Sequence, residues 1–383
     1  MSRWPLMPLG EICTFVGGGT PSRAKPEYFD GNIPWATVKD FKSFRLADTQ
    51  EHITEKAIAD SAVSIVDPGT VLLVSRVGLG KVAIADTRLA INQDIKGLTP
   101  DDTISPDFLF WFLLSQASRI ESMGAGATVK GVTLNDIKRI PIPVPSLPEQ
   151  RRIVDLLSRA EGIVRLRREA EKKAAELIPA LFLDMFGDPA TNPKGWPVEI
   201  FDEIGVLDRG RSRHRPRDAK ELYGGPYPFI QTGDVANSRG RIVNFTTTYS
   251  EAGLAQSKLW KRGTLCITIA ANIAKTGVLE FDACFPDSVV GFLPSGRART
   301  AYVQAWLGFL QPTLEANAPQ AAQKNINLEI LRNLPIPVPP LALQATFEQR
   351  CNDVVSIQTQ QTAATAKAQA AFDAMSSKFF SAF

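Results

Sequence analysis

A run of cations near the middle of the chain is the densest group of side chains able to bind a charged ligand. Five arginines alternate with other residues between Arg209 and Arg217, and Lys220 brings the total to six positive charges within twelve residues. Guanidinium groups bind phosphates and guanine edges through paired hydrogen bonds, and glycine and proline break the run into a loop. The run predicts a DNA-binding loop; a solvated loop or a contact with an acidic protein is the alternative. Its candidate DNA-binding residues are Arg209, Arg211, Arg213, His214, Arg215 and Arg217.

The first half of the chain has a more dispersed set of cations in the corresponding region. Arg23, Lys25 and Arg45 belong to this set, and Arg76 and Lys81 lie beside the glycines at positions 78 and 80. Dispersed cations are equally typical of a solvated surface. Outside the arginine run, the candidate DNA-binding residues are Lys39, Lys42, Arg76, Lys81, Lys130, Lys275 and Lys324.

Motifs for catalysis are weak. Phe15-Val16-Gly17-Gly18-Gly19 matches an adenosylmethionine-binding pattern, but Thr20-Pro21-Ser22 follows where a nucleotide-binding loop should open a helix. Gly78-Leu79-Gly80-Lys81 lacks the spacing and the terminal Ser or Thr of a phosphate-binding loop. The Asx-Pro-Pro-aromatic tetrapeptide of base-modifying methyltransferases does not occur. Two histidines and no carboxylate pair at helical spacing give no convincing acid-base pair, so we expect no catalytic residue.

Composition narrows the class of protein further. The two histidines and four cysteines lack the close pairing of a zinc site, and scattered cysteines are typical of a reduced, cytoplasmic chain. We find no signal peptide and no apolar run of about 20 residues that could cross a membrane. A net charge of +3 is too small to attract nucleic acid over the whole surface, so any such surface must be local.

The sequence is an internal repeat. Ile140-Pro141-Ile142-Pro143-Val144-Pro145 returns as Leu334-Pro335-Ile336-Pro337-Val338-Pro339, with five of six residues identical at an offset of 194. The offset is 192 near the start, where Trp4-Pro5 returns as Trp196-Pro197. A constant register over such a distance is not compositional. Further pairs at 194 are Pro34 with Pro228, Asp40 with Asp234, Gly97 with Gly291, Lys130 with Lys324, and Leu134 with Leu328.

Each copy predicts a compact domain followed by a long helix. The domains, residues 1–145 and 188–339, mix short strand-like runs with one apolar helical stretch, Phe108 to Leu114 or Tyr302 to Leu310. The fold class is therefore a duplicated α/β (α+β) fold. Lys130 and Lys324 precede the last strand-like run of each copy, which predicts a shared contact with backbone phosphate.

The helices, residues 146–187 and 340–383, carry apolar residues at the three-then-four spacing of a coiled coil. An isolated helix with so weak an apolar stripe needs a partner, so we expect the two to pair antiparallel as a pseudo-twofold strut of about 38 residues, roughly 55 Å. Alternatively, each helix docks on its own domain. The seam in the first helix is predicted at Ile153, Leu156, Ala160, Ile163, Ala170, Ala174, Leu177 and Leu181, interrupted by Arg167. In the second helix it is predicted at Ile357, Gln361, Ala364, Ala368, Ala371 and Met375.

Two similar domains at a fixed separation suit a target with two half-sites, as duplex DNA offers. Because the loops of the copies differ, the half-sites need not be palindromic. The base sequence cannot be read from one chain, since readout depends on side-chain aim and groove depth.

Several motifs together resemble type I restriction-modification specificity subunits over the whole chain. They are Leu9-Gly10-Glu11-Ile12 with Gly18-Gly19-Thr20-Pro21, Ile33-Pro34-Trp35, Leu147-Pro148-Glu149-Gln150-Arg151-Arg152-Ile153, and Phe186-Gly187-Asp188-Pro189 followed by Asn192-Pro193 and Gly195-Trp196. The second copy departs from the third motif, with Leu341-Ala342-Leu343-Gln344-Ala345, which leaves the start of its helix open.

The resemblance implies a non-catalytic DNA-reading subunit with two target recognition domains and spacer helices. It implies double-stranded DNA, two methyltransferase subunits and restriction subunits as partners. Adenosylmethionine, ATP and magnesium would bind those partner subunits, and no cofactor would bind this chain. The competing hypotheses are a self-sufficient DNA-modifying enzyme and a coiled-coil scaffold that binds protein alone.

Overall fold

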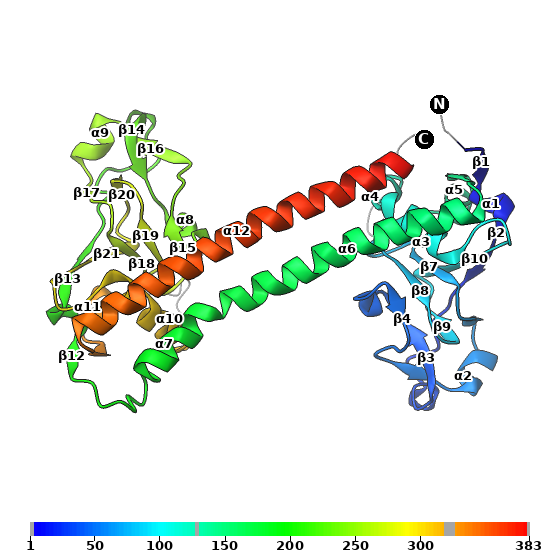
Figure 1. Cartoon of the computed structure of the whole chain (residues 1–383), viewed down its shortest axis with the longest axis horizontal. Coiled ribbons are helices and arrows are strands. Elements are labelled where there is room, and N and C mark those ends of the chain that lie inside the picture. Colours follow the sequence, from blue (N-terminus) through cyan, green and yellow to red (C-terminus); the bar gives the residue numbers. More distant parts are fainter. Residues whose placement is uncertain (1–3, 127–129, 318–325, 381–383) are drawn as a thin grey trace. The chain divides into compact units, whose positions relative to one another are not determined.

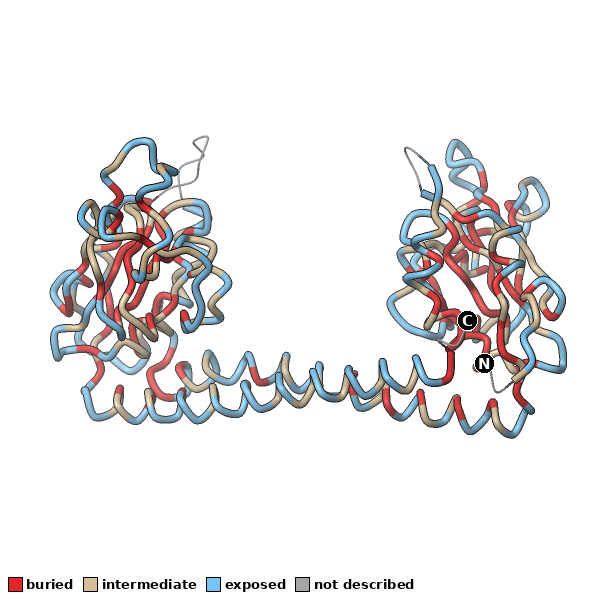
Figure 2. Tube along the Cα trace, turned by 90° about the horizontal axis from the view of Figure 1, so that it is seen from above, coloured by how far each residue is buried: buried red, intermediate tan, exposed pale blue. Residues whose placement is uncertain are grey.

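The computed structural model describes residues 4–126, 130–317 and 326–380 (Figure 1). They form two compact units, one of Met1–Arg168 with Ala363–Phe383 and the other of Glu169–Thr362. Each unit thus contains one copy of the repeat and a segment of each long helix. Figure 2 shows that buried residues are concentrated within the two domains and recur at intervals along the long helices.

The first unit is built on two sheets. A five-stranded sheet has the order β2-β10-β7-β8-β4, a four-stranded sheet has the order β5-β3-β9-β6, and β1 pairs with β11. The strands are β1 (Leu6–Pro8), β2 (Cys13–Gly17), β3 (Ile33–Ala36), β4 (Arg45–Leu46), β5 (His52–Ile53), β6 (Ser64–Val66), β7 (Val71–Val74), β8 (Val82–Ala85), β9 (Leu89–Ile91), β10 (Ile95–Pro100) and β11 (Pro141–Pro143). The helices are α1 (Leu9–Ile12), η1 (Pro26–Tyr28), η2 (Val38–Asp40), α2 (Glu55–Ala59), α3 (Pro106–Ser115), α4 (Ala117–Ser122), α5 (Leu134–Lys138) and the first part of α6 (Leu147–Ala175).

Strand β7 shows why the short apolar runs form the centre of the unit. All four of its residues are buried. Val71 and Leu73 pack with the apolar side of α3, whereas Leu72 and Val74 pack with residues of the four-stranded sheet. Successive side chains of a strand point to opposite faces, so a strand covered on both faces reads as an unbroken apolar run.

The second unit repeats this topology strand for strand. Its sheets have the orders β13-β21-β18-β19-β15 and β16-β14-β20-β17, and β12 pairs with β22, so each strand has its counterpart eleven strands later. The strands are β12 (Val198–Ile200), β13 (Gly205–Arg209), β14 (Tyr223–Phe229), β15 (Gly240–Ile242), β16 (Thr247–Tyr249), β17 (Leu259–Trp260), β18 (Leu265–Thr268), β19 (Thr276–Leu279), β20 (Ala283–Cys284), β21 (Val289–Pro294) and β22 (Pro335–Pro337). The helices are α7 (Leu177–Phe186), η3 (Phe201–Glu203), η4 (Lys220–Leu222), α8 (Thr232–Asn237), α9 (Glu251–Ala255), α10 (Thr300–Ala316), α11 (Leu328–Arg332) and the first part of α12 (Leu341–Phe380).

The paired glycines Gly97 and Gly291 show how closely the copies agree. Each lies in the strand next to the centre of its five-stranded sheet, β10 or β21. A Cβ at Gly291 would lie 2.6 Å from the Trp260 ring, and one at Gly97 would lie 3.0 Å from Val66. The other sheet approaches too closely for a side chain at this point, which explains why both copies have glycine.

The long helices run antiparallel within each unit. In the first unit the Arg168 guanidinium donates to Gln369 at 2.8 Å, while Ile153 shares a core cluster with Phe380. In the second, Gln358 donates to the carbonyl of Ala174 at 2.7 Å, and Phe182 of α7 packs on Phe347. The predicted duplicated α/β fold with two long antiparallel helices is confirmed.

The predicted seam was wrong in register at several positions. Ile163, Leu177 and Ile357 are 51%, 44% and 47% exposed, and Ala170 and Ala371 are also exposed. The observed buried or half-buried series in α6 and α7 is Ile153, Leu157, Ala160, Val164, Arg167, Glu171, Ala174, Ile178, Leu181 and Met185. In α12 it is Gln344, Phe347, Cys351, Val354, Gln358, Gln361, Thr365, Ala368, Phe372, Met375 and Phe379. Arg167 therefore continues the seam instead of interrupting it.

A buried glutamine fixes the start of each long helix. The Gln150 side chain accepts from the backbone N–H of Ser105 at 2.8 Å and donates to the carbonyls of Thr103 and Pro145 at 2.7 and 2.9 Å. Gln344 makes the same three bonds to Arg299, Arg297 and Pro339. Both glutamines are fully buried. The uncertain start of the second helix is thereby settled at Leu341, 194 residues after Leu147.

Candidate nucleic-acid interface

The arginine run, residues 209–217, forms a loop after β13 that is attached to the second unit through its backbone. The N–H of Arg211 donates to the carbonyl of Phe285 at 3.0 Å. The side-chain oxygen of Gln256 accepts from the N–H groups of Arg213 and His214 at 2.6 and 3.1 Å. These bonds hold the main chain while leaving the side chains at 211 and 213 exposed.

The guanidinium groups of this loop are not equivalent. Arg215 donates to the carbonyls of Ser212 and His214, both at 2.7 Å, and so stabilises its own loop. Arg217 forms an ion pair with Asp287 at 3.0 Å. Their charges are thus partly used inside the protein.

Three arginines of the loop keep their charge available. Within residues 4–126, 130–317 and 326–380, no hydrogen bond or ion pair engages the guanidinium of Arg209, Arg211 or Arg213. His214 lies 3.8 Å from Glu221, at the limit of an ion pair. The loop therefore presents Arg211 and Arg213 as exposed cations whose guanidinium groups form no hydrogen bond or ion pair with the described residues.

In the first unit, Arg76 and Lys130 are brought together. An isolated bridge joins Arg76 to Gly131, the neighbour of Lys130. Arg76 lies 3.8 Å from Asp94, and the aliphatic part of Lys81 lies beside Gly78 together with Val38 of η2. Lys39 follows Val38 and Lys42 comes three residues later, both exposed. The dispersed cations of the first half thus come from neighbouring loops.

The hairpin loops of the two central strand pairs share part of their conformation. Val77 and Ala271, 194 residues apart, both have left-handed backbones, with φ of 51° and 63°. The N–H of Val74 donates to the carbonyl of Lys81 at 2.9 Å, and that of Thr268 donates to Lys275 at 2.9 Å. Lys81 and Lys275 therefore occupy the same place in the two units. Lys324 lies outside the described residues.

Lys258 is a basic residue beside the arginine loop that sequence reasoning missed. Its ammonium group donates to Asp208 at 2.8 Å and lies 3.8 Å from the centre of the Trp260 ring. Burial alone would raise the pKa of Asp208, but the hydrogen bond and charge of Lys258, together with the N–H of Arg209 and the charge of Arg211, hold that pKa below its ordinary value. The fifty residues between Asp208 and Lys258 gave no local signal for this pair.

A family model described as "Type I restriction modification DNA specificity domain" matches residues 1–176 and 193–362. The chain belongs to this family. The two matched segments include both sets of paired sheets described above, so the resemblance seen in the sequence motifs is confirmed.

Curated relatives carry the same description. The type I restriction enzyme MjaIX specificity subunit of Methanocaldococcus jannaschii is 28% identical over 67% of this chain. The EcoR124I/EcoR124II specificity subunit of Escherichia coli is 30% identical over 44% of it. The chain spans 63% and 44% of the lengths of these two relatives.

Solved structures show the same fold over nearly the whole chain. A chain from a structure described as "Structural basis underlying complex assembly and conformational transition of the type I R-M system" matches 98% of this chain and 97% of its own length, with a TM-score of 0.65 at 21% identity. The S subunit of a type I system from M. genitalium matches 99% of this chain and 96% of its own, with a TM-score of 0.55 at 15% identity.

The glycine run of this specificity-domain chain has a structural role. A Cβ at Gly18 would lie 2.2 Å from the carbonyl oxygen of Ile91, and one at Gly19 would lie 2.3 Å from that of Ala62. The carbonyl of Gly19 accepts from the indole N–H of Trp35 at 3.2 Å. Close packing of backbone against backbone explains these glycines without a bound nucleotide.

No three His, Cys, Asp or Glu side chains among the described residues gather into a group that could hold a metal ion. Among the helices of residues 4–126, 130–317 and 326–380, none is both long and apolar enough to cross a membrane.

Proposed function

We propose that this chain is the DNA sequence-specificity subunit of a type I restriction-modification complex, acting in the cytoplasm on double-stranded DNA. The observation that carries the proposal is the strand-for-strand duplication of one domain, each copy of which matches the specificity-domain family. Each copy would read one half of a bipartite target. The curated relatives, named as specificity subunits, support the same function.

The arginine loop supports a role in the second half-site. Arg211 and Arg213 project from a backbone held by Gln256, and free guanidinium groups on a fixed loop suit phosphates and guanine edges. In the first unit, the neighbouring Arg76, Lys81 and Lys130 would contact the other half-site. Because the two sets of cations lie on different loops, the half-sites would differ in sequence.

The long helices would set the spacing of the half-sites. They pair antiparallel in each unit, and Gln150 and Gln344 fix where each helix leaves its domain. A rigid start favours a defined geometry. Removing whole heptads from both helices should therefore change the recognised spacing and leave the recognised bases unchanged.

Catalysis would belong to partner subunits. Two methyltransferase subunits would supply adenosylmethionine, and restriction subunits would supply ATP and magnesium chemistry. The structural explanation of the glycine run, which otherwise matches an adenosylmethionine-binding pattern, supports assigning no catalytic residue to this chain.

Methylation mapping tests the proposal directly. The chain is co-expressed with a type I methyltransferase subunit, and methylated adenines are located across the host genome. We expect one bipartite motif that disappears when this chain is omitted. The purified chain alone should transfer no methyl group from adenosylmethionine to DNA; transfer without a partner would show a self-sufficient enzyme.

Salt dependence separates DNA binding from a scaffold that binds protein alone. Phosphate contacts release counterions, so the DNA affinity of a reader should fall steeply with salt, by about tenfold or more between 50 and 200 mM. DNA binding that is absent, or indifferent to salt, would favour the scaffold.

A further inference from the structure

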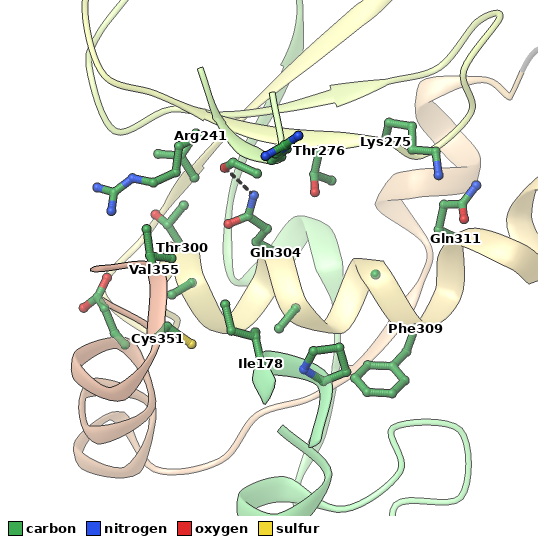
Figure 3. Close-up of a pocket in the computed structure, with 18 of the residues that line it drawn as sticks. Ile178, Arg241, Lys275, Thr276, Thr300, Gln304, Phe309, Gln311, Cys351 and Val355 are labelled. Carbon is green, nitrogen blue, oxygen red and sulfur yellow. Dashed lines mark hydrogen bonds between the residues drawn. The ribbon is translucent and has the colours of Figure 1, made fainter. Parts of the chain in front are cut away.

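The second unit contains a pocket of about 580 Å³ between α10, α7, α12 and the edge of its five-stranded sheet (Figure 3). Its apolar wall includes Ile178, Ala305, Gly308 and Phe309. Cys351 of α12 also lines it, and burial raises the pKa of that thiol to about 11. A mostly apolar cavity of this volume is of the size that small molecules fill in proteins.

The repeat explains why the pocket is open. At the offset of 194, larger side chains stand in the first unit at four of the lining positions. At these positions the side chain in the second unit is thus smaller than its equivalent in the first. The pairs, first unit then second, are Trp111 and Ala305, Leu114 and Gly308, Leu157 and Cys351, and Phe372 and Ile178. The reverse holds at other lining positions, where for example Phe309 and Gln311 correspond to the smaller Ser115 and Ala117.

In the first unit these larger side chains leave a smaller pocket, of about 260 Å³, at the same place, lined by Trp111, Leu114 and Phe372. The Trp111 ring lies 5.7 Å from that of Phe44 and 5.8 Å from that of Phe372, and the Trp111 residue is 5% exposed. Phe44 has no aromatic counterpart, because the pairing of β4 with β8 and of β15 with β19 aligns it with Gly240. The second unit therefore lacks the indole around which this region packs in the first.

One side of the pocket is polar and cationic. Figure 3 shows Lys275, Thr276 and Arg241 on the sheet side, across the pocket from Ile178 and Phe309. Arg241 is paired with Glu280 at 2.5 Å. By contrast, the side chains of Arg239 and Lys275, both lining the pocket, have no hydrogen bond or ion pair to any residue that the structure describes. Among the described residues that line the pocket, the one carboxylate, Glu348, is paired with Arg299 at 2.9 Å.

We propose that this pocket binds a small aromatic molecule carrying one anionic group. The ring would take the place that Trp111 fills in the first unit, stacking against the apolar wall of Ala305, Gly308 and Phe309. The anion would pair with Lys275, with Arg239 as a second cation. Apolar cavities left by a missing side chain bind molecules of matching shape, and an unpaired cation at the rim selects for negative charge.

Titration of the intact chain with indole-3-propionate tests this. We expect one saturable site with a Kd on the order of 0.1 mM, as for a ligand of this size. Ala305→Trp, which restores the residue found in the first unit, should weaken binding at least tenfold. Unchanged binding to this variant, or no saturation by the unmodified chain in the millimolar range, would overturn the proposal.

Two further variants keep the test sharp. Gly308→Leu introduces the residue that the first unit has at this position, Leu114, and should also weaken binding. It replaces Ala305→Trp as the test if that variant fails to fold. Lys275→Gln should weaken the binding of indole-3-propionate several-fold but leave the binding of the neutral 3-methylindole unchanged. Equal effects on both probes, or on neither, would remove the role of Lys275 in recognising an anion.

Discussion

The loop after β2 and the loop after β13 hold the same place in two copies of one fold, yet they carry very different side chains. Gly19 in the first unit and Arg211 in the second both donate their backbone N–H to the corresponding strand end, Ile91 or Phe285, at 3.0 Å. The first loop is rich in glycine because backbone approaches closely, and the second carries the arginines. The backbone framework is therefore repeated while the exposed chemistry differs.

The helix face that packs against the long helices differs in the same way. Beside Trp111 in the first unit a pocket of about 260 Å³ remains, whereas beside Ala305 in the second the pocket is about 580 Å³. The comparison indicates that strand order and helix starts tolerate little change, whereas surface loops and one helix face vary freely. Substitutions at paired positions can test each part of this statement.

Trp111 and Ala305 should give the largest difference between the units. Trp111→Ala removes a nearly buried ring and should lower the free energy of unfolding of the first unit by about 3–5 kcal/mol. Ala305→Trp enters existing space and should change it by less than about 1 kcal/mol. Urea unfolding followed by circular dichroism measures both changes. Equal losses of unfolding free energy would show that the helix faces around Trp111 and Ala305 are packed alike.

Gln150 and Gln344 should instead behave alike. Replacing either with alanine leaves three backbone groups, one of them in a buried hydrogen bond, without their partner, and should cost about 2–4 kcal/mol in each unit. Gln349→Ala, on the exposed side of the same helix as Gln344, is the control and should cost less than about 0.5 kcal/mol. A strong effect at one glutamine only would show that the two helix starts are not equivalent.

The arginine loop should affect one half-site alone. Arg211→Ala with Arg213→Ala should weaken binding to the target by about 10- to 100-fold, since two charged contacts are lost. Duplexes with either half-site scrambled reveal which half is affected, measured by fluorescence anisotropy. Lys39→Ala with Lys42→Ala is the matched change in the first unit. Equal loss at both half-sites from the arginine variant would contradict the proposed division of labour.

Asp208 should give the smallest effect, confined to the second unit. Its folded pKa is lowered, so its contribution to stability is present above the unfolded pKa, about 3.9, and is lost as the pH falls through the folded value. The side chain is 40% exposed, so Asp208→Asn should cost less than about 1 kcal/mol at pH 7. The gap between variant and parent should start to close as the pH falls below about 3.9 and should be gone below the folded pKa of Asp208. A gap that stays constant on acidification would point to a cause other than charge.

Much of the fold followed from the repeat. The offset of 194 identified equivalent strands, the proline runs and the ends of both long helices, because the same backbone requires similar residues at tight places such as Gly97 and Gly291. The register of the seam along the long helices could not be predicted from the repeat. After Ile153, both Leu156 and Leu157 are apolar, and only the docking of the first turn through Gln150 decides which one is buried.

The candidate interface was predictable in part. The arginine run identified a loop, but its sequence could not show that Arg217 pairs with Asp287 or that Arg215 binds its own carbonyls, because these contacts depend on side-chain aim. The pocket did leave a signal in the sequence. Aligning Trp111 with Ala305 and Leu114 with Gly308 reveals lost volume, provided that the repeat is compared position by position.

The exchange of Trp111 for Ala305 means that duplication has not made the molecule symmetrical. Two identical partners that dock on this face of the two units would meet different surfaces, one with a smaller hollow than the other. Their binding constants would then differ, and assembly would proceed in two steps through a well-populated intermediate with a single partner bound.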